Sequence, residues 1–292
     1  MFLVAAIAVI LAMFSPLLGL VFTVGVGGRY QLSRINHVFY LAMVIPLVIF
    51  FLTSIIDIVT FTDISSGVIL SSVAFFLVLK KQEDYVLAIF AVVIINVIYG
   101  LLRHLIFGNT FALMVSATIE EYQSILQERM QQNSENIILA TELLHSVKQL
   151  LIKYFTGLWS FSMTLGIYLG AVIYSRKKMP GWQHRLIRLP QGLIYILILT
   201  LIMLLIAPAR TLAVNVMLVI FPLLLIQGIA ILDFFWGKYF TKSRFLLYLL
   251  IVAIIFNHYL IILIGLMGLF DIWFNFRKIR TVEENINESD SD

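Results

Sequence analysis

The fold is decided by stretches such as Tyr85–Leu102, which reads YVLAIFAVVIINVIYGLL and contains no charged side chain. An α-helix rises about 1.5 Å per residue, so crossing the ~30 Å hydrocarbon core of a bilayer takes about 20 predominantly apolar residues. This stretch comes close to that length, and its main polar groups belong to Asn96 and Tyr99. It therefore predicts a transmembrane helix.

The composition of the whole chain gives the same result. Of the 292 residues, 61% are hydrophobic and only 12% are charged, whereas soluble domains average about 45–50% apolar and about 25% charged residues. Too few polar side chains remain to cover a water-soluble particle of this size, so the excess apolar surface must face lipid. We expect an all-α, polytopic transmembrane bundle in the bacterial cytoplasmic membrane, with the lipid bilayer as its first partner.

Further apolar stretches predict the other spans. The N-terminal stretch lacks the positive n-region and the cleavage site of a signal peptide, so it is interpreted as a retained span. The final block is too long for one crossing and is expected to cross twice, divided near Asn257-His258. About nine spans result. The stretches are Phe2–Val26 (interrupted at Ser15-Pro16), His37–Thr60, Gly67–Leu79, Tyr154–Tyr174, Pro190–Ala207, Thr211–Trp236 and Phe245–Phe276.

The segment 109–153 is polar enough to leave the bilayer, but apolar residues still recur in it at spacings of three and four. This pattern predicts two amphipathic helices, broken near Gln131–Ser134. The segment would separate N-terminal transmembrane helices (residues 1–108) from C-terminal ones (154–280), and residues 281–292 would form a disordered acidic tail. The apolar stripes consist of Ile119, Tyr122, Leu126 and Met130, and of Ile137, Leu144, Val147 and Leu151.

Basic residues are confined to short loops, and the positive-inside rule places those loops in the cytoplasm. The C-terminus is then cytoplasmic and the segment 109–153 lies outside. The net charge of +4 is too small and too scattered to indicate nucleic-acid binding. The loops contain Arg29 and Arg34, Lys80 and Lys81, Arg176–Arg188, Lys238–Arg244, and Arg277–Arg280.

Catalytic chemistry has no support in the sequence. The absence of cysteine excludes thiolate nucleophiles, disulfides and iron–sulfur ligation. The five histidines lack the spacing of a metal site, and no nucleophile motif or close carboxylate pair occurs within a span. We therefore expect no enzyme activity, no catalytic residue, no bound metal and no cofactor.

Polar residues at membrane depth are the candidate ligand-binding groups, because they usually face the bundle interior or a cavity. Asn96, Asn215 and Gln227 are the predicted hydrogen-bonding residues for a small solute, and Arg210 is the predicted charge at an outward mouth. Interhelical hydrogen bonding without any ligand is the alternative for the amides. Arg210 and the other charged residues near span ends (Asp57, Arg103, Asp233 and Asp271) can also be explained as interface anchors that reach water.

The C-terminal half carries motifs that resemble a known family. They are Leu189-Pro190, Ala213–Val216, Leu225–Ala230 and, most specifically, Gly268–Lys278, which reads GLFDIWFNFRK. They resemble the YybS-like bacterial membrane proteins, a family with a domain of unknown function (DUF2232). Asp271 and Arg277 are six residues apart, too far round one helix for ideal pairing. Asp271 is therefore expected to cap a helix or to pair with a basic loop such as 238–244.

That family is distantly similar to the substrate-capturing membrane subunit of energy-coupling-factor transporters. The resemblance implies a small-solute-binding subunit without its own ATPase, working with a partner transmembrane subunit and paired ATPases. The chain is longer than such a subunit, because it has extra spans and the segment 109–153. The alternative is a non-catalytic membrane scaffold or envelope-associated interaction protein that acts through that segment.

Overall fold

The computed structural model describes residues 1–32, 36–129, 134–178, 184–242, 253 and 256–278. All the regular structure in those ranges is helical, as the sequence predicts. In order the helices are α1 (Phe2–Phe14), α2 (Pro16–Gly25), α3 (Gly28–Gln31), α4 (Asn36–Leu52), α5 (Ile58–Asp63), α6 (Ser71–Gln82), α7 (Tyr85–Arg129), α8 (Ser134–Lys153), α9 (Phe155–Lys178), α10 (Gly192–Leu205), α11 (Arg210–Lys242) and α13 (His258–Phe274).

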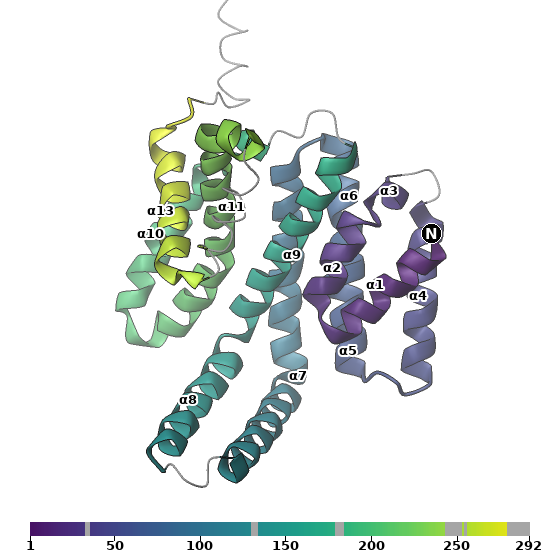
Figure 1. Ribbon diagram of the computed structural model, residues 1–292, viewed down its shortest axis with the longest axis vertical. Helices are drawn as coiled ribbons and strands as arrows, with labels where there is room; N and C mark the ends of the chain where they lie inside the picture. Colours follow the sequence, from purple (N-terminus) through teal and green to yellow (C-terminus); the bar gives the residue numbers. More distant parts are fainter. Residues whose placement is uncertain (33–35, 130–133, 179–183, 243–252, 254–255, 279–292) are drawn as a thin grey trace, which may run out of the picture.

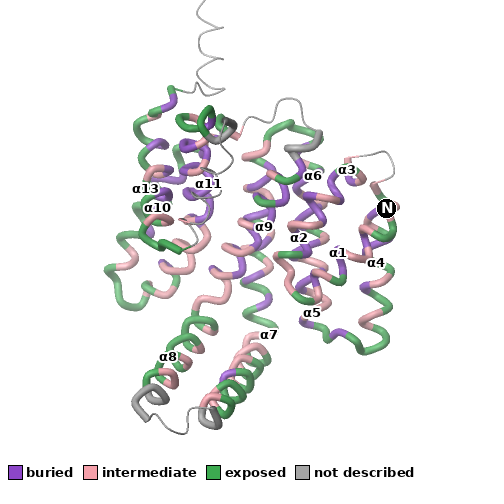
Figure 2. Tube along the Cα trace, viewed as in Figure 1, coloured by how far each residue is buried: buried purple, intermediate pink, exposed green. Residues whose placement is uncertain are grey.

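Helix α9 runs through the middle of the bundle. It packs against α2, α7 and α11, and in Figure 1 it separates α1, α2 and α4 on one side from α10, α11 and α13 on the other. Purple segments in Figure 2 lie where these helices face one another, while the outer faces are largely exposed. Large apolar side chains such as Leu199 (57% exposed) and Ile94 (57%) cover those outer faces. Such a surface requires lipid around it.

The predicted span Phe2–Val26 consists of two helices that pack against each other. The break comes at Ser15, whose extended backbone ends α1, and Pro16 then occupies the first turn of α2. Proline is tolerated there because its missing N–H would have had no helical partner. Each helix is too short to cross a bilayer straight, at 13 and 10 residues.

The predicted span Gly67–Leu79 is longer than expected. Helices α5 and α6 are joined by a π-helical segment, Ile64–Leu70, into one continuous helix, Ile58–Gln82. The wider turn of a π-helix accommodates a bulky neighbour, and the ring of Trp159 packs closely against Gly67. The preceding prediction, His37–Thr60, is correspondingly too long, because α4 ends at Leu52.

Helix α7 has 45 residues, which corresponds to a length of about 68 Å, roughly twice the hydrocarbon thickness. Its second half and α8 pack together as a helical hairpin that extends away from the bundle (Figure 1). Helix α7 passes through residues 108 and 109 without interruption, and the boundary between the membrane part and the segment 109–153 stays a prediction. The expected break near residues 131–134 falls mainly on residues 130–133, which lie outside the described ranges; α7 is described to Arg129 and α8 from Ser134.

Among the described residues, four helices are long and apolar enough to cross a membrane: Ile58–Gln82, Tyr85–Leu126, Phe155–Tyr174 and Ala207–Tyr239. Five further apolar helices, α1, α2, α4, α10 and α13, have only 10–17 residues each. The count of about nine spans therefore stays a prediction. The expected division of the last block at Asn257 agrees with the start of α13, where the Asn257 side chain accepts the N–H groups of Tyr259 and Leu260.

The two ends of the bundle differ in character. The ends of α6, α11 and α13, which carry basic residues, lie at one end, at the top of Figure 1, and the hairpin leaves the opposite end. This arrangement agrees with the topology predicted from the positive-inside rule, in which the basic loops lie on one side of the membrane and the segment 109–153 lies on the other. The cytoplasmic assignment of the basic end and of the C-terminus stays a prediction, as does the acidic tail, because residues 279–292 lie outside the described ranges.

Candidate functional site

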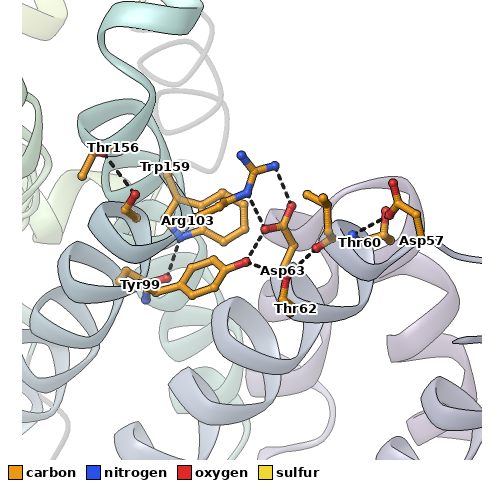
Figure 3. A network of polar contacts seen from close by, with 11 residues as sticks. Asp57, Thr60, Thr62, Asp63, Tyr99, Arg103, Thr156 and Trp159 are labelled. Atoms are coloured by element: carbon orange, nitrogen blue, oxygen red, sulfur yellow. Dashed lines mark hydrogen bonds and ion pairs between the residues drawn. The ribbon is translucent and has the colours of Figure 1, made fainter. Parts of the chain in front are cut away.

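A buried ion pair forms where α7 approaches the end of the bundle. The guanidinium of Arg103 donates from Nε to Oδ1 of Asp63 (2.7 Å) and from Nη2 to Oδ2 (3.1 Å), and the hydroxyl of Tyr99 also donates to Oδ1 (Figure 3). Arg103 is 6% exposed and Asp63 9%. Bidentate pairing of this kind gives both charged groups hydrogen-bond partners in a site that is shielded from water. We name the group Asp63, Tyr99, Arg103, Trp159 and Asn96 the Arg103 cluster.

Aromatic rings complete the surroundings of Arg103. Its guanidinium carbon lies 4.2 Å from the ring centroid of Phe155, 4.9 Å from that of Phe111 and 5.9 Å from that of Trp159. Ring faces attract cations and replace part of the lost hydration. Because Phe111 belongs to α7 and Phe155 begins α9, the contacts tie together the two helices from which the hairpin emerges. Arg103 was expected to reach water near a span end, and that expectation was wrong, because Asp63 and these rings bury it.

Asn96 joins three helices within this cluster. Its Nδ2 donates to Oγ of Ser71 on α6 (2.8 Å) and to the carbonyl of Val92 (2.9 Å), and its Oδ1 accepts from Nε1 of Trp159 on α9 (3.0 Å). Both donor hydrogens and the oxygen are engaged by the protein. Asn96 thus acts here as an interhelical clamp, which was the alternative interpretation of its position at membrane depth.

Asn215 braces the base of the hairpin. Its Oδ1 accepts the N–H of Gly157 in the first turn of α9 (2.8 Å), and its Nδ2 donates to the carbonyls of Thr211 (2.9 Å) and Lys153 (3.4 Å). The N–H groups of a first helical turn and the carbonyls of a last one have no partner within their own helix. Asn215 supplies partners to the end of α8 and to the start of α9, and so fixes the junction between them.

Arg210 lies at the start of α11, exposed, and its Nε donates to the carbonyl of Leu204 near the end of α10 (3.3 Å). A basic side chain in this position satisfies one of the free carbonyls at a helix C-terminus. Like the hairpin, it lies at the end of the bundle away from the basic loops.

A second buried cluster lies near the basic end, between α11 and α13. Oδ2 of Asp271 accepts from Nε (3.1 Å) and Nη2 (2.7 Å) of Arg277 and from Nε2 of Gln227 (2.9 Å). Arg277 also donates to the carbonyls of Arg185 (2.7 Å) and Ile187 (2.8 Å). Gln227 Oε1 in turn accepts the N–H of Leu189 (2.8 Å). We name Asp271, Arg277 and Gln227 the Asp271 cluster; it fastens the segment 184–189 to two helices.

The pairing of Asp271 with Arg277 contradicts the partner expected from their spacing. That expectation assumed one continuous helix, but α13 ends at Phe274 and Asn275 has a left-handed backbone, with φ 45°. The chain reverses there and brings Arg277 back over the carboxylate. Asparagine is one of the few residues that adopt this conformation readily.

The four predicted ligand-binding residues are not brought together. Asn96 belongs to the Arg103 cluster, Gln227 to the Asp271 cluster, Asn215 to the base of the hairpin, and Arg210 caps a helix. Their role toward a solute stays a prediction. Asp63 was not among the predicted site residues, although a carboxylate inside the apolar run that follows Ile58 was a usable signal.

In the described part of the chain, no group of three His, Asp or Glu side chains is placed to hold a metal ion. In the Arg103 cluster the donors and acceptors satisfy one another, which is the arrangement of a structural network. In the Asp271 cluster all the side-chain contacts of the carboxylate go to Oδ2, and Oδ1 of Asp271 is buried without a hydrogen-bond partner. The absence of enzyme activity stays a prediction.

The apolar outer surface, the helices long enough to cross a bilayer and the buried ion pairs define an integral membrane protein of the helical-bundle class. The chain matches the model of a family described as predicted membrane protein (DUF2232) over residues 3–272, and it belongs to that family. Searches of curated proteins and of solved structures gave no match. The family predicted from the C-terminal motifs is confirmed, while its YybS-like naming and its similarity to energy-coupling-factor subunits stay predictions.

Proposed function

We propose that this protein is a membrane-embedded scaffold that presents the α7–α8 hairpin to a partner protein. The reach of the hairpin is the first argument. If α7 enters the bilayer at Tyr85, about 20 residues bring it to the far interface near Leu105. The remaining turns, with α8 packed beside them, then stand about 35 Å clear of the hydrocarbon.

The rigidity of its base is the second argument, and it carries the proposal. Three sets of contacts at that end fix the hairpin to the bundle. Arg103 lies between rings of α7 and α9, Asn215 joins the end of α8 to the start of α9, and Thr156 Oγ1 donates to the carbonyl of Gly100 (3.3 Å). Burying charges costs hydration free energy, and an ion pair compensates for that cost only while its partners keep their geometry. Movement of the helices around the pair would therefore be unfavourable. Because the Asp63–Arg103 ion pair lies at this junction, it holds the hairpin in one direction relative to the bundle.

The third argument is the unpaired apolar face of α8. Leu139 (64% exposed), Leu143 (65%), Val147 (37%) and Leu150 (52%) lie within an arc of about 80° at 100° per residue. The side of α8 that packs on α7 is not the side that carries these four exposed residues. A helix with one packed apolar face and one exposed apolar face is suited to a further partner helix.

Site-specific photocrosslinking in intact cells tests the proposal. A photoreactive phenylalanine analogue at Leu143 is expected to give one discrete crosslinked protein, whereas the same analogue at His145, exposed on the polar side of α8, gives none. Leu139→Glu should remove the product. Equal crosslinking from both positions, or a product that survives Leu139→Glu, would refute the proposed surface.

A small-solute-binding transport subunit without its own ATPase is the second candidate. Its support is the set of buried amides at membrane depth, because polar residues at that depth usually face the bundle interior or a cavity and commonly have a function. Its weakness is that Asn96 and Gln227 already have protein partners, so a solute would have to displace them at the full desolvation penalty.

Native mass spectrometry of the purified protein separates the two candidates. A co-purifying solute, or a partner transmembrane subunit with ATPases, supports transport, and loss of the solute in Asn96→Leu would assign the site. The absence of both from preparations that still carry the α8 crosslinking partner favours the scaffold. We also propose the bacterial cytoplasmic membrane as the location.

A further inference from the structure

A π-helical segment, Ile64–Leu70, lies within the long apolar helix Ile58–Gln82, between α5 and α6. Each hydrogen bond of a π-helix closes over five residues instead of four, so the segment accommodates one residue more than an α-helix would between the same two ends. Short π-helical segments inside α-helices are rare and are frequently found at functional sites. The helix therefore carries one extra residue at the place where it contacts α2 and α7.

The polar contacts with α7 depend on that extra residue. Asp63, directly before the π segment, accepts from Arg103, and Ser71, directly after it, accepts from Asn96. Asn96 and Arg103 are seven positions apart on α7 (96 to 103), about 20° short of two full turns, so they face nearly the same direction. Asp63 and Ser71 are eight positions apart (63 to 71), which in an α-helix would place them about 80° apart around the axis. The extra residue makes these eight steps equivalent to seven and turns both side chains toward α7.

Serine hydroxyls support the wider turn. Opening an α-helix deprives some carbonyl groups of their usual partners, and serine side chains can replace those partners. The hydroxyl of Ser71 donates to the carbonyl of Ser66 (3.1 Å) and that of Ser72 donates to the carbonyl of Ile69 (2.9 Å). Both carbonyls belong to the π segment. The same span therefore supplies the donors that its π-helical form requires.

The chain before α5 can take up the extra residue. Helix α4 ends at Leu52 and α5 begins at Ile58, and the connector 53–57 between them is not helical, with a left-handed backbone at Ser54 (φ 57°). Helix α5 has only six residues and packs mainly against α4 and the π segment. If the π segment became α-helical while α6 stayed in place, α5 would move about 1.5 Å toward the connector and turn by about 100° about its axis.

We propose that the π segment is a conformational switch that controls the Asp63–Arg103 ion pair. Passing the extra residue to the connector 53–57 turns α5, withdraws Asp63 from Arg103 and leaves Arg103 with its aromatic contacts alone. The base of the hairpin then loses its ion pair. Because breaking a buried ion pair is costly, the π-helical form with the pair intact is the resting state. The switch is independent of the proposed scaffold function, since all the contacts that define it lie within the bundle.

Removing one residue tests whether the segment holds an extra one. Deletion of Leu70, which is 49% exposed at the end of the π segment, should keep α5 and α6 in register and leave the unfolding temperature in detergent close to that of the unsubstituted protein. Deletion of Ile94, which is 57% exposed in α7, is the matched control. It should lower the unfolding temperature by roughly 10 °C or more, because it turns one part of an α-helix by about 100° against its neighbours. Arg103→Met should have the same effect with Leu70 present or deleted, since the ion pair is intact in both.

Spin labels test whether α5 turns. Labels on cysteines at Ile58 of α5 and Leu199 of α10, both exposed, should give one distance by double electron–electron resonance in the resting protein. The double variant Asp63→Leu with Arg103→Met removes the ion pair, and a second distance should then appear, displaced by up to about 10 Å, because the label at Ile58 is carried round the helix. Deletion of Leu70 in the same background should remove the second distance.

Two results would overturn the proposal. If deletion of Leu70 lowered the unfolding temperature as much as deletion of Ile94, the segment would hold no extra residue. If the double variant kept a single, unchanged distance, α5 would not turn in the absence of the ion pair. Neither measurement involves the exposed face of α8, so failure of the switch is distinguishable from failure of the scaffold proposal.

Discussion

At the scale of single residues, the buried polar groups form hydrogen bonds and ion pairs with one another. A carboxylate or guanidinium taken from water loses its hydration, and only a close partner with additional hydrogen bonds compensates. Asp63 receives Arg103 and Tyr99, and Asp271 receives Arg277 and Gln227. Contacts between helices therefore explain why these polar side chains lie at membrane depth, and no ligand is needed to explain them.

The ion pair of the Arg103 cluster leads to a double-mutant prediction. Arg103→Met should destabilise the protein by about 3–5 kcal/mol, because it leaves Asp63 buried without its cation. The double variant Asp63→Leu with Arg103→Met should be more stable than Arg103→Met alone, since no uncompensated charge remains. Thermal unfolding in detergent measures both, and Lys80→Met is the matched control at an exposed cation. A double variant less stable than Arg103→Met would contradict the assignment.

At the scale of elements, the contact between α11 and α13 depends on two glycines. A Cβ on Gly228 would overlap the carbonyl oxygen of Ile264, and a Cβ on Gly268 would overlap that of Leu224. The backbones of the two helices therefore touch directly, as small residues permit in membranes. The Asp271 cluster lies one turn beyond this contact, so the close approach also sets its geometry.

Gly228→Ala and Gly268→Ala are each expected to lower stability by about 1–3 kcal/mol, because the added methyl forces packed backbone apart. Gly192→Ala is the control, since nothing lies within 4 Å of a Cβ there; it should be neutral or slightly stabilising. The prediction is tested by comparing the unfolding temperatures of the three variants with that of the unsubstituted protein. If Gly192→Ala lowered stability as much as the other two substitutions, close packing between α11 and α13 would not be the cause.

At the scale of the whole molecule, the positive-inside rule predicts that the two ends of the bundle face different compartments. Because the chain has no cysteine, single cysteines introduced into it report accessibility without background. Cysteine at Leu113 or Leu139 should react with a membrane-impermeant maleimide on intact cells, and cysteine at Lys80 only after permeabilisation. Cysteine at Ile94 should stay unreactive in both states, because lipid covers it. Labelling of Lys80→Cys in intact cells would reverse the orientation.

The sequence by itself determined that this is a membrane protein built of helices, because apolar stretches such as Tyr85–Leu102 cannot be covered by 12% charged residues. It also determined the family, and the three- and four-residue spacing after Ile119 predicted amphipathic helices in the segment 109–153 but not how they pack. These properties depend on composition and local periodicity, which a sequence records directly.

Only the tertiary structure decided what the polar residues contact. Asn96 meets Trp159 across 63 positions, Arg103 meets Asp63 across 40, and Asn215 meets Gly157 across 58. Arg277 reaches Asp271 because of a left-handed residue between them. Such partners are set by which helices pack side by side and by where the chain turns. Apolar residues occur on all sides of each span, so the hydrophobic pattern does not indicate which helix packs against which.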